Sequence, residues 1–152
     1  MYPVLNPEPR KAMNVLLHIF TLIIMTFFFK TGNNSPKNHP FDPCPDSPNC
    51  VIDAADYSLP GDMLFHSAVE TLNYMKATEL QTDENNLKIN AVFRIRFFGF
   101  KDDLLISIEE KGPEQSRVYI RSASRTGYSD LGVNRRRINN FFTNLENKII
   151  TL

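Results

Sequence analysis

The chain has 152 residues, which is enough for one domain and a terminal extension. Its 17 Lys and Arg side chains are balanced by 17 Asp and Glu side chains, so the formal net charge is zero. A protein without a net positive field lacks the electrostatic footprint of a nucleic-acid-binding protein, and nucleic acid is therefore excluded as an expected partner.

Residues 12–29, AMNVLLHIFTLIIMTFFF, are the long apolar block of the sequence. As an α-helix this block would be about 27 Å long, just enough to cross the hydrocarbon layer of a bilayer. Residues 1–11 include Arg10 and Lys11, a basic flank that predicts a cytoplasmic n-region under the positive-inside rule. The block is expected to be a signal anchor or a signal peptide, and the rest of the chain is expected to be exported.

The residues after the apolar block distinguish a retained anchor from a cleaved signal. A peptidase site needs small side chains, but Phe29 and Lys30 stand where these are preferred. We therefore expect a single-pass membrane protein, bound to the membrane through residues 12–29, with its C-terminal domain exported. Secretion after signal cleavage is the alternative, and a buried helix is the third interpretation.

Residues 30–50 are rich in proline and asparagine and contain both cysteines, Cys44 and Cys50. Proline lacks a backbone donor, so this stretch cannot be a regular helix or an inner strand and is expected to be a tether. In an oxidising compartment two cysteines this close can form a small disulfide loop. Free thiols and a zinc site are the alternatives, although zinc would lack a standard second ligand pair. We expect the disulfide, and neither a metal ion nor a cofactor.

Residues 51–152 carry the periodic patterns of one folded domain. A first helix is expected after Asp62, its predicted N-cap, because apolar residues recur there at helical spacing. Four strands are expected next from alternating apolar and polar residues, and a last amphipathic helix is expected with Asn134 as its N-cap. The strands are expected at residues 78–82, 87–97, 104–108 and 118–123, with Lys101, Asp102 and Asp103 in a turn.

The order of these elements predicts the fold class. Consecutive strands with short turns imply an antiparallel sheet, and the two helices must cover one of its faces. We therefore expect an α+β domain, with a four-stranded antiparallel sheet covered by an N-terminal and a C-terminal helix and preceded by the signal-anchor helix.

Residues 121–137, RSASRTGYSDLGVNRRR, are rich in polar and cationic side chains that a core does not need. If strand 104–108 pairs antiparallel with strand 118–123, Asp102 and Asp103 approach Arg121 and Arg125. The favoured interpretation is a structural salt-bridge network. The run Arg135–Arg137 is expected to be a solvated helix face, with contact to lipid headgroups as the minor alternative.

A ligand site is the second interpretation of this passage. Arginine side chains, serine hydroxyls and the backbone amides at a helix start can hold a phosphate or a carboxylate, so this interpretation predicts a small anionic ligand. A lipid-like ligand enclosed by the helix-covered sheet is a further alternative, which rests on analogy with other folds alone. The candidate ligand-binding residues are Asp102, Asp103, Arg121, Ser122, Ser124, Arg125, Tyr128, Asp130 and Asn134.

A hydrolase is the third interpretation. Asp102 and Asp103 would be the acid–base pair or metal ligands, and Ser122 or Ser124 would be the nucleophile. No sequence argument places a base beside either serine, and adjacent Asp residues on a strand point to opposite faces. This weighs against an enzyme.

Three motifs, CPDSPNC, FFGFKDD and RSASRTGYSDLGVNRRRI, resemble those of the domain-of-unknown-function family DUF1499, over roughly residues 44–142. The resemblance implies an exported or membrane-associated protein, and it supplies no catalytic residue. Together with the patterns above, it favours a membrane-tethered exported domain that serves as a binding or structural module.

Overall fold

The computed structural model describes residues 36–95 and 99–151. The predicted n-region and the apolar block of residues 12–29 lie outside the described residues. Among the residues that are described, no helix is both long and apolar enough to cross a membrane.

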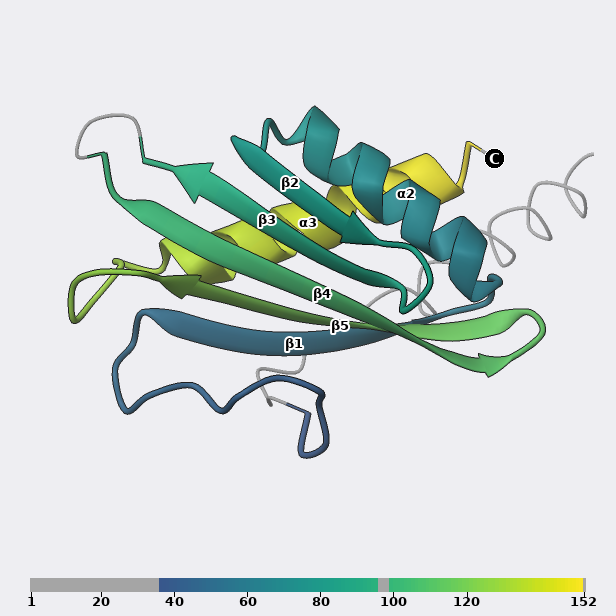
Figure 1. Cartoon of the computed structure of the whole chain (residues 1–152), viewed down its shortest axis with the longest axis horizontal. Coiled ribbons are helices and arrows are strands. Elements are labelled where there is room, and N and C mark those ends of the chain that lie inside the picture. The colour runs from purple at the N-terminus through teal and green to yellow at the C-terminus, as the bar shows by residue number, and fades with distance from the viewer. Residues whose placement is uncertain (1–35, 96–98, 152) are drawn as a thin grey trace, which may run out of the picture. The chain divides into compact units, whose positions relative to one another are not determined.

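A five-stranded antiparallel sheet forms the centre of the domain (Figure 1), with the strand order β1-β5-β4-β3-β2. The α+β class is confirmed, but the prediction of four strands is wrong by one. The five strands are β1 (Cys50–Tyr57), β2 (Glu79–Asp83), β3 (Lys88–Arg94), β4 (Lys101–Gly112) and β5 (Gln115–Ser124).

Strand β1 is the strand that the sequence pattern did not reveal. Its sequence, CVIDAADY, contains two Ala and two Asp, residue types that are depleted in strands. It pairs with β5 along its whole length, from Cys50 opposite Ala123 to Tyr57 opposite Ser116. Pairing with a long neighbour therefore makes this segment a strand, despite its low intrinsic propensity.

Helices α2 (Gly61–Tyr74) and α3 (Val133–Ile149) cover one face of the sheet, which we call the inner face (Figure 1). The core lies between these helices and β3, β4 and β5, and each fully buried apolar side chain there contributes about 1.5–3 kcal/mol. The largest fully buried apolar side chains are Leu64, Leu72, Ile89, Leu104, Ile106, Ile120, Ile138, Phe141 and Leu145.

Both predicted N-caps are wrong. Helix α2 begins at Gly61 after Pro60, and Asp62 lies within its first turn, where a carboxylate is favourable to the helix dipole. Helix α3 follows Gly132, and the carboxylate that satisfies its start belongs to Asp130. The backbone N–H of Asn134 donates to Asp130 Oδ2 at 2.6 Å, so Asn134 is free to turn its side chain inward.

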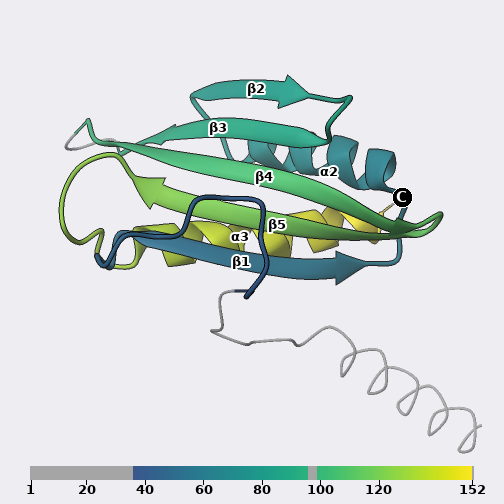
Figure 2. The same cartoon turned by 60° about the horizontal axis from the view of Figure 1, so that its bottom comes forward.

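The other face of the sheet, the outer face, is crossed by the end of the tether, residues 36–49 (Figure 2). Cys44 and Cys50 form the predicted disulfide and so fasten this segment to the start of β1. The backbone N–H of Ser124 donates to Asn49 O at 3.0 Å. The tether is therefore attached where β5 ends.

Candidate functional site

The register of β4 and β5 divides the polar passage between the two faces of the sheet. Asp102 lies opposite Ser124, Leu104 opposite Ser122, and Leu105 opposite Arg121. Because successive strand residues point to opposite faces, Asp102 and Ser122 face the helices, while Asp103 and Arg121 face outward. Lys101, Asp102 and Asp103, which were predicted to form a turn, are the first residues of β4.

A buried ion pair lies on the inner face, at the end of the sheet where β4 begins and β5 ends. Arg137 Nη2 donates to Asp102 Oδ2 at 2.6 Å, and the two side chains are only 9% and 0% exposed. The guanidinium also stacks over the ring of Phe93, with its carbon 5.0 Å from the ring centroid. Asp102 therefore forms a salt bridge, but its arginine comes from α3 and is neither of the expected partners, Arg121 and Arg125.

Asn134 extends this ion pair into a network. Its Oδ1 accepts from Arg137 Nη1 at 2.7 Å and from Ser122 Oγ at 2.6 Å. Its Nδ2 donates to Ser124 Oγ at 3.0 Å and to the backbone oxygen of Asn49 at 2.9 Å. The side chain of Asn134 therefore joins α3, β5 and the tether. We call Asp102, Ser122, Ser124, Asn134 and Arg137 the inner cluster.

The chemistry open to the inner cluster is limited by its own bonding. Ser122 is fully buried and gives its proton to an amide oxygen, which cannot act as a general base. Asp102 Oδ1 is buried without a hydrogen-bond partner among the described residues. This arrangement is a structural lock between α3 and the sheet, and the amide that accepts the proton of Ser122 gives this serine no general base.

The arginine run of α3 is not the solvated face that its sequence predicted. The side chain of Arg137 is only 9% exposed, and Arg135 donates to Asp53 Oδ2 of β1 at 2.7 Å. Arg136 alone of the three is exposed, and its Nη1 donates to the backbone oxygen of Leu131 at 3.0 Å. The run therefore ties α3 to β1 and to β4.

On the outer face Asp103 pairs with Arg125. Arg125 Nε and Nη2 donate to Asp103 Oδ1 at 3.0 and 2.7 Å, and this hydrogen bonding raises the pKa of the arginine. Both side chains are exposed, so the pair is screened by water and contributes little to stability.

Arg121 lies next to this pair and does not share it. Its cross-strand neighbours are Leu105 and Ile52, and the predicted pairing of Arg121 with Asp102 or Asp103 is wrong. Asp102 faces the opposite side, and Asp103 is occupied by Arg125. Within the described residues Arg121 has neither a hydrogen bond nor an ion pair, and its Nε is buried.

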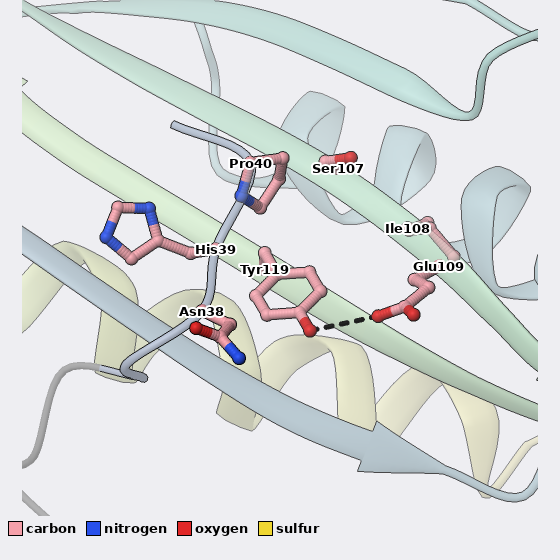
Figure 3. A pocket seen from close by; sticks show the side chains of 7 residues that line it. All are labelled: Asn38, His39, Pro40, Ser107, Ile108, Glu109 and Tyr119. Atoms are coloured by element: carbon pink, nitrogen blue, oxygen red, sulfur yellow. Dashed lines mark hydrogen bonds between the residues drawn. The ribbon is translucent and has the colours of Figure 1, made fainter. Parts of the chain in front are cut away.

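A shallow hollow of about 430 Å³ lies further along the outer face, between the tether and strands β4 and β5 (Figure 3). Tyr119, on the same face as Arg121, donates to Glu109 Oε2 at 2.9 Å. This hydrogen bond, followed by that of Lys111, lowers the pKa of Glu109. The lining residues are Asn38, His39, Pro40, Ser107, Ile108, Glu109 and Tyr119.

Sequence reasoning did not find this hollow. Tyr119 and Arg121, two residues apart on β5, share the outer face, but nothing in the sequence showed that the tether folds back over that face. Among the remaining candidates, Tyr128 is 75% exposed in the loop between β5 and α3. No three His, Cys, Asp or Glu side chains gather as a metal site would require in residues 36–95 and 99–151.

Comparison with known proteins gives a family and a fold. The family model described as a protein of unknown function, DUF1499, matches residues 41–145. None of the curated proteins matches the sequence.

Among solved structures, the fold resembles the di-domain ARO/CYC StfQ from the steffimycin biosynthetic pathway, with 8% identity and a TM-score of 0.52. That match covers 62% of this chain and 43% of StfQ, so the chain spans less than half of its length. The protein TTHA0849 from Thermus thermophilus is 14% identical with a TM-score of 0.46, and the match covers 67% of this chain and 97% of that protein.

Proposed function

The chain belongs to the DUF1499 family of proteins of unknown function, and we propose that its domain is a membrane-attached, exported binding module that holds a small anionic ligand on the outer face of its sheet. The observation that carries this proposal is Arg121. Its guanidinium has no anionic partner among the described residues, although its Nε is buried. An unpaired, partly buried cation is costly, and a ligand carboxylate or phosphate would offset that cost.

The surroundings of Arg121 support a ligand of limited size. The hollow beside Tyr119 has a volume within the usual range for small-molecule sites, roughly 300–1,000 Å³. Ser107 and Tyr119 add hydroxyls on the same face, and His39 adds a ring nitrogen from the tether. Glu109 disfavours an anion within the hollow itself, so the acidic group of the ligand belongs beside it, at Arg121, which lies two residues from Tyr119 on the same face of β5 and does not line the hollow.

The inner cluster supports binding over hydrolysis. A nucleophile needs a base within hydrogen-bond reach and access to the substrate, and Ser122 is sealed against the amide of Asn134. The residues with catalytic potential are thus engaged in holding α3 on the sheet. What remains open to a ligand on the outer face is the guanidinium of Arg121 and the nearby hydroxyls of Ser107 and Tyr119.

Attachment to the membrane rests on the apolar block at residues 12–29 and its basic flank. Fractionation and protease accessibility in intact spheroplasts test this part of the proposal. A full-length protein that is membrane-bound and cleaved by external protease is the expected result, whereas recovery in the soluble cytosol would contradict it.

Ligand binding is tested by titrating inorganic phosphate and short-chain carboxylates into the full-length protein in detergent, with calorimetric detection. The wild type should bind, and Arg121→Gln should not. Arg117→Gln is the matched control, because Arg117 lies on the same face of β5 and is already paired with Asp56 at 2.6 Å. Equal loss of binding in both variants, or no binding by the wild type, would contradict the proposal.

A further inference from the structure

Large apolar side chains are exposed together at one end of the domain. Of the six such side chains among the described residues, three belong to the connections around the start of β4 and the end of β5. Leu131 is 85% exposed, Tyr128 75% and Phe100 49%. We call these three side chains the apolar tip.

The two connections that carry the apolar tip are adjacent in space. Phe100 immediately precedes β4, and the backbone N–H of Arg125 donates to Lys101 O at 3.0 Å, which joins the start of β4 to the loop after β5. Figures 1 and 2 both show the start of β4 and the end of β5 at the same end of the sheet. Asn49 Nδ2 donates to the backbone oxygen of Gly127, so the end of the tether is fixed there as well.

The loop between β5 and α3 holds its apolar side chains outward by its own hydrogen bonds. Asp130 accepts from the backbone N–H groups of Gly132 and Asn134, which closes a tight turn around Leu131. Leu131 has a φ of 53°, a left-handed conformation that a leucine rarely adopts. The turn therefore keeps a large apolar side chain in water, where it gains nothing from the fold.

Positive charge accompanies the apolar tip. Arg136 is exposed and bonded to the backbone of Leu131, and Arg94 is exposed at the end of β3. Neither has an ion pair among the described residues. Exposed aromatic and aliphatic side chains next to unpaired arginines fit the boundary between headgroups and acyl chains of an anionic bilayer, where tyrosine is enriched and each nearby arginine adds attraction.

We propose that the apolar tip docks the domain onto an anionic lipid surface, with Tyr128 and Leu131 inserted at the level of the headgroups. The inference rests on the proposed membrane attachment, because an anchor at residues 12–29 and a short tether would keep the domain beside the bilayer at high effective concentration. Docking would orient the sheet so that the end where β4 begins and β5 ends faces the lipid, with the β4–β5 hairpin at the far end.

The chain contains no tryptophan, so single substitutions create unambiguous fluorescent reporters. Tyr128→Trp reports on the apolar tip, and Tyr74→Trp on α2 is the matched control, because Tyr74 is 74% exposed. Each full-length variant is reconstituted in vesicles of phosphatidylcholine and phosphatidylglycerol with brominated acyl chains. Insertion to a depth of about 5–10 Å should quench the emission of Tyr128→Trp roughly twofold and leave that of Tyr74→Trp nearly unchanged.

Vesicle flotation of the same samples reports attachment separately from docking. Flotation without selective quenching of Tyr128→Trp would overturn the docking and leave the attachment standing. Failure to float would overturn both. An emission shift of Tyr128→Trp that appears equally without lipid, at high protein concentration, would mean that the tip contacts protein and would also overturn the inference. Arg136→Gln combined with Arg94→Gln should weaken the quenching in anionic vesicles.

Discussion

The two faces of the sheet treat the same kind of chemistry in opposite ways. On the inner face, Arg137 and Asp102 are buried as a pair, and amide and hydroxyl groups satisfy the arginine further. On the outer face, Asp103 and Arg125 form an exposed pair, and Arg121 has no ion pair within the part of the chain that the structure describes. The polar residues that the sequence groups into one candidate site therefore form two separate groups, one on each face of the sheet.

This difference determines which arginine matters for stability. A buried charge that loses its partner retains its full desolvation cost, whereas an exposed pair is screened. Arg137, on the inner face, is thus expected to stabilise the fold. Arg121, on the outer face, is expected to be available for binding a ligand.

The largest effect is expected from Arg137→Ala. It leaves Asp102 buried without its counter-ion and should lower the free energy of unfolding by about 3–5 kcal/mol in urea denaturation. The double variant Asp102→Leu/Arg137→Met is the sharper control, because it removes both charges and should recover most of that loss. A single variant that unfolds like the wild type would show that the inner cluster is not a lock.

Removal of the disulfide should have the next largest effect. Cys44→Ser/Cys50→Ser frees the end of the tether and should cost about 2 kcal/mol, the entropy of closing such a small loop. Phosphate affinity should fall as well, since the tether covers the outer face. Mass spectrometry of the wild type from its native compartment should show two hydrogens fewer than the reduced chain. Two alkylatable thiols in that protein would show that Cys44 and Cys50 are not bonded to each other and that no disulfide holds the end of the tether.

The smallest effect is expected from Tyr57→Phe, on the inner face of β1. Burial, together with the charge of Glu146, raises the pKa of Tyr57 above its ordinary value of about 10, and its hydroxyl has no partner among the described residues. Above pH 10 the unfolded phenol loses its proton and the folded one keeps it, so wild-type stability should fall as pH rises.

At pH 7 Tyr57 is protonated in both the folded and the unfolded state, so Tyr57→Phe should change the free energy of unfolding by less than about 1 kcal/mol. Above pH 10 the free energy of unfolding of this variant should fall less steeply with pH than that of the wild type. Tyr74→Phe, at an exposed position, should keep it. Equal alkaline curves for wild type and Tyr57→Phe would contradict the assigned burial of this phenol.

Sequence reasoning succeeded where one short-range pattern decides the outcome. Strand alternation predicted that Asp102 and Asp103 would point to opposite faces if they lie on a strand, as they do at the start of β4. It failed for β1, whose Ala and Asp residues carry no strand signal, and for the partner of Asp102, which comes from a distant helix.

A signal for that partner was nevertheless present in the helix. The buried stripe of α3 runs through Ile138, Phe141 and Leu145, and helical spacing extended backward from it reaches Asn134 and Arg137. Two polar residues on an apolar stripe predict a buried network. The fold-back of the tether over the outer face has no comparable signal, because proline-rich segments carry no periodicity.

The most direct test of the division between the faces is thermal denaturation of wild type, Arg137→Ala and Arg121→Ala, each with and without inorganic phosphate. We expect Arg137→Ala to melt well below the wild type and still to be stabilised by phosphate. Arg121→Ala should melt close to the wild type without phosphate and gain nothing from its addition. A strong loss of stability in Arg121→Ala that is indifferent to phosphate would contradict the account, because it would make the outer arginine structural.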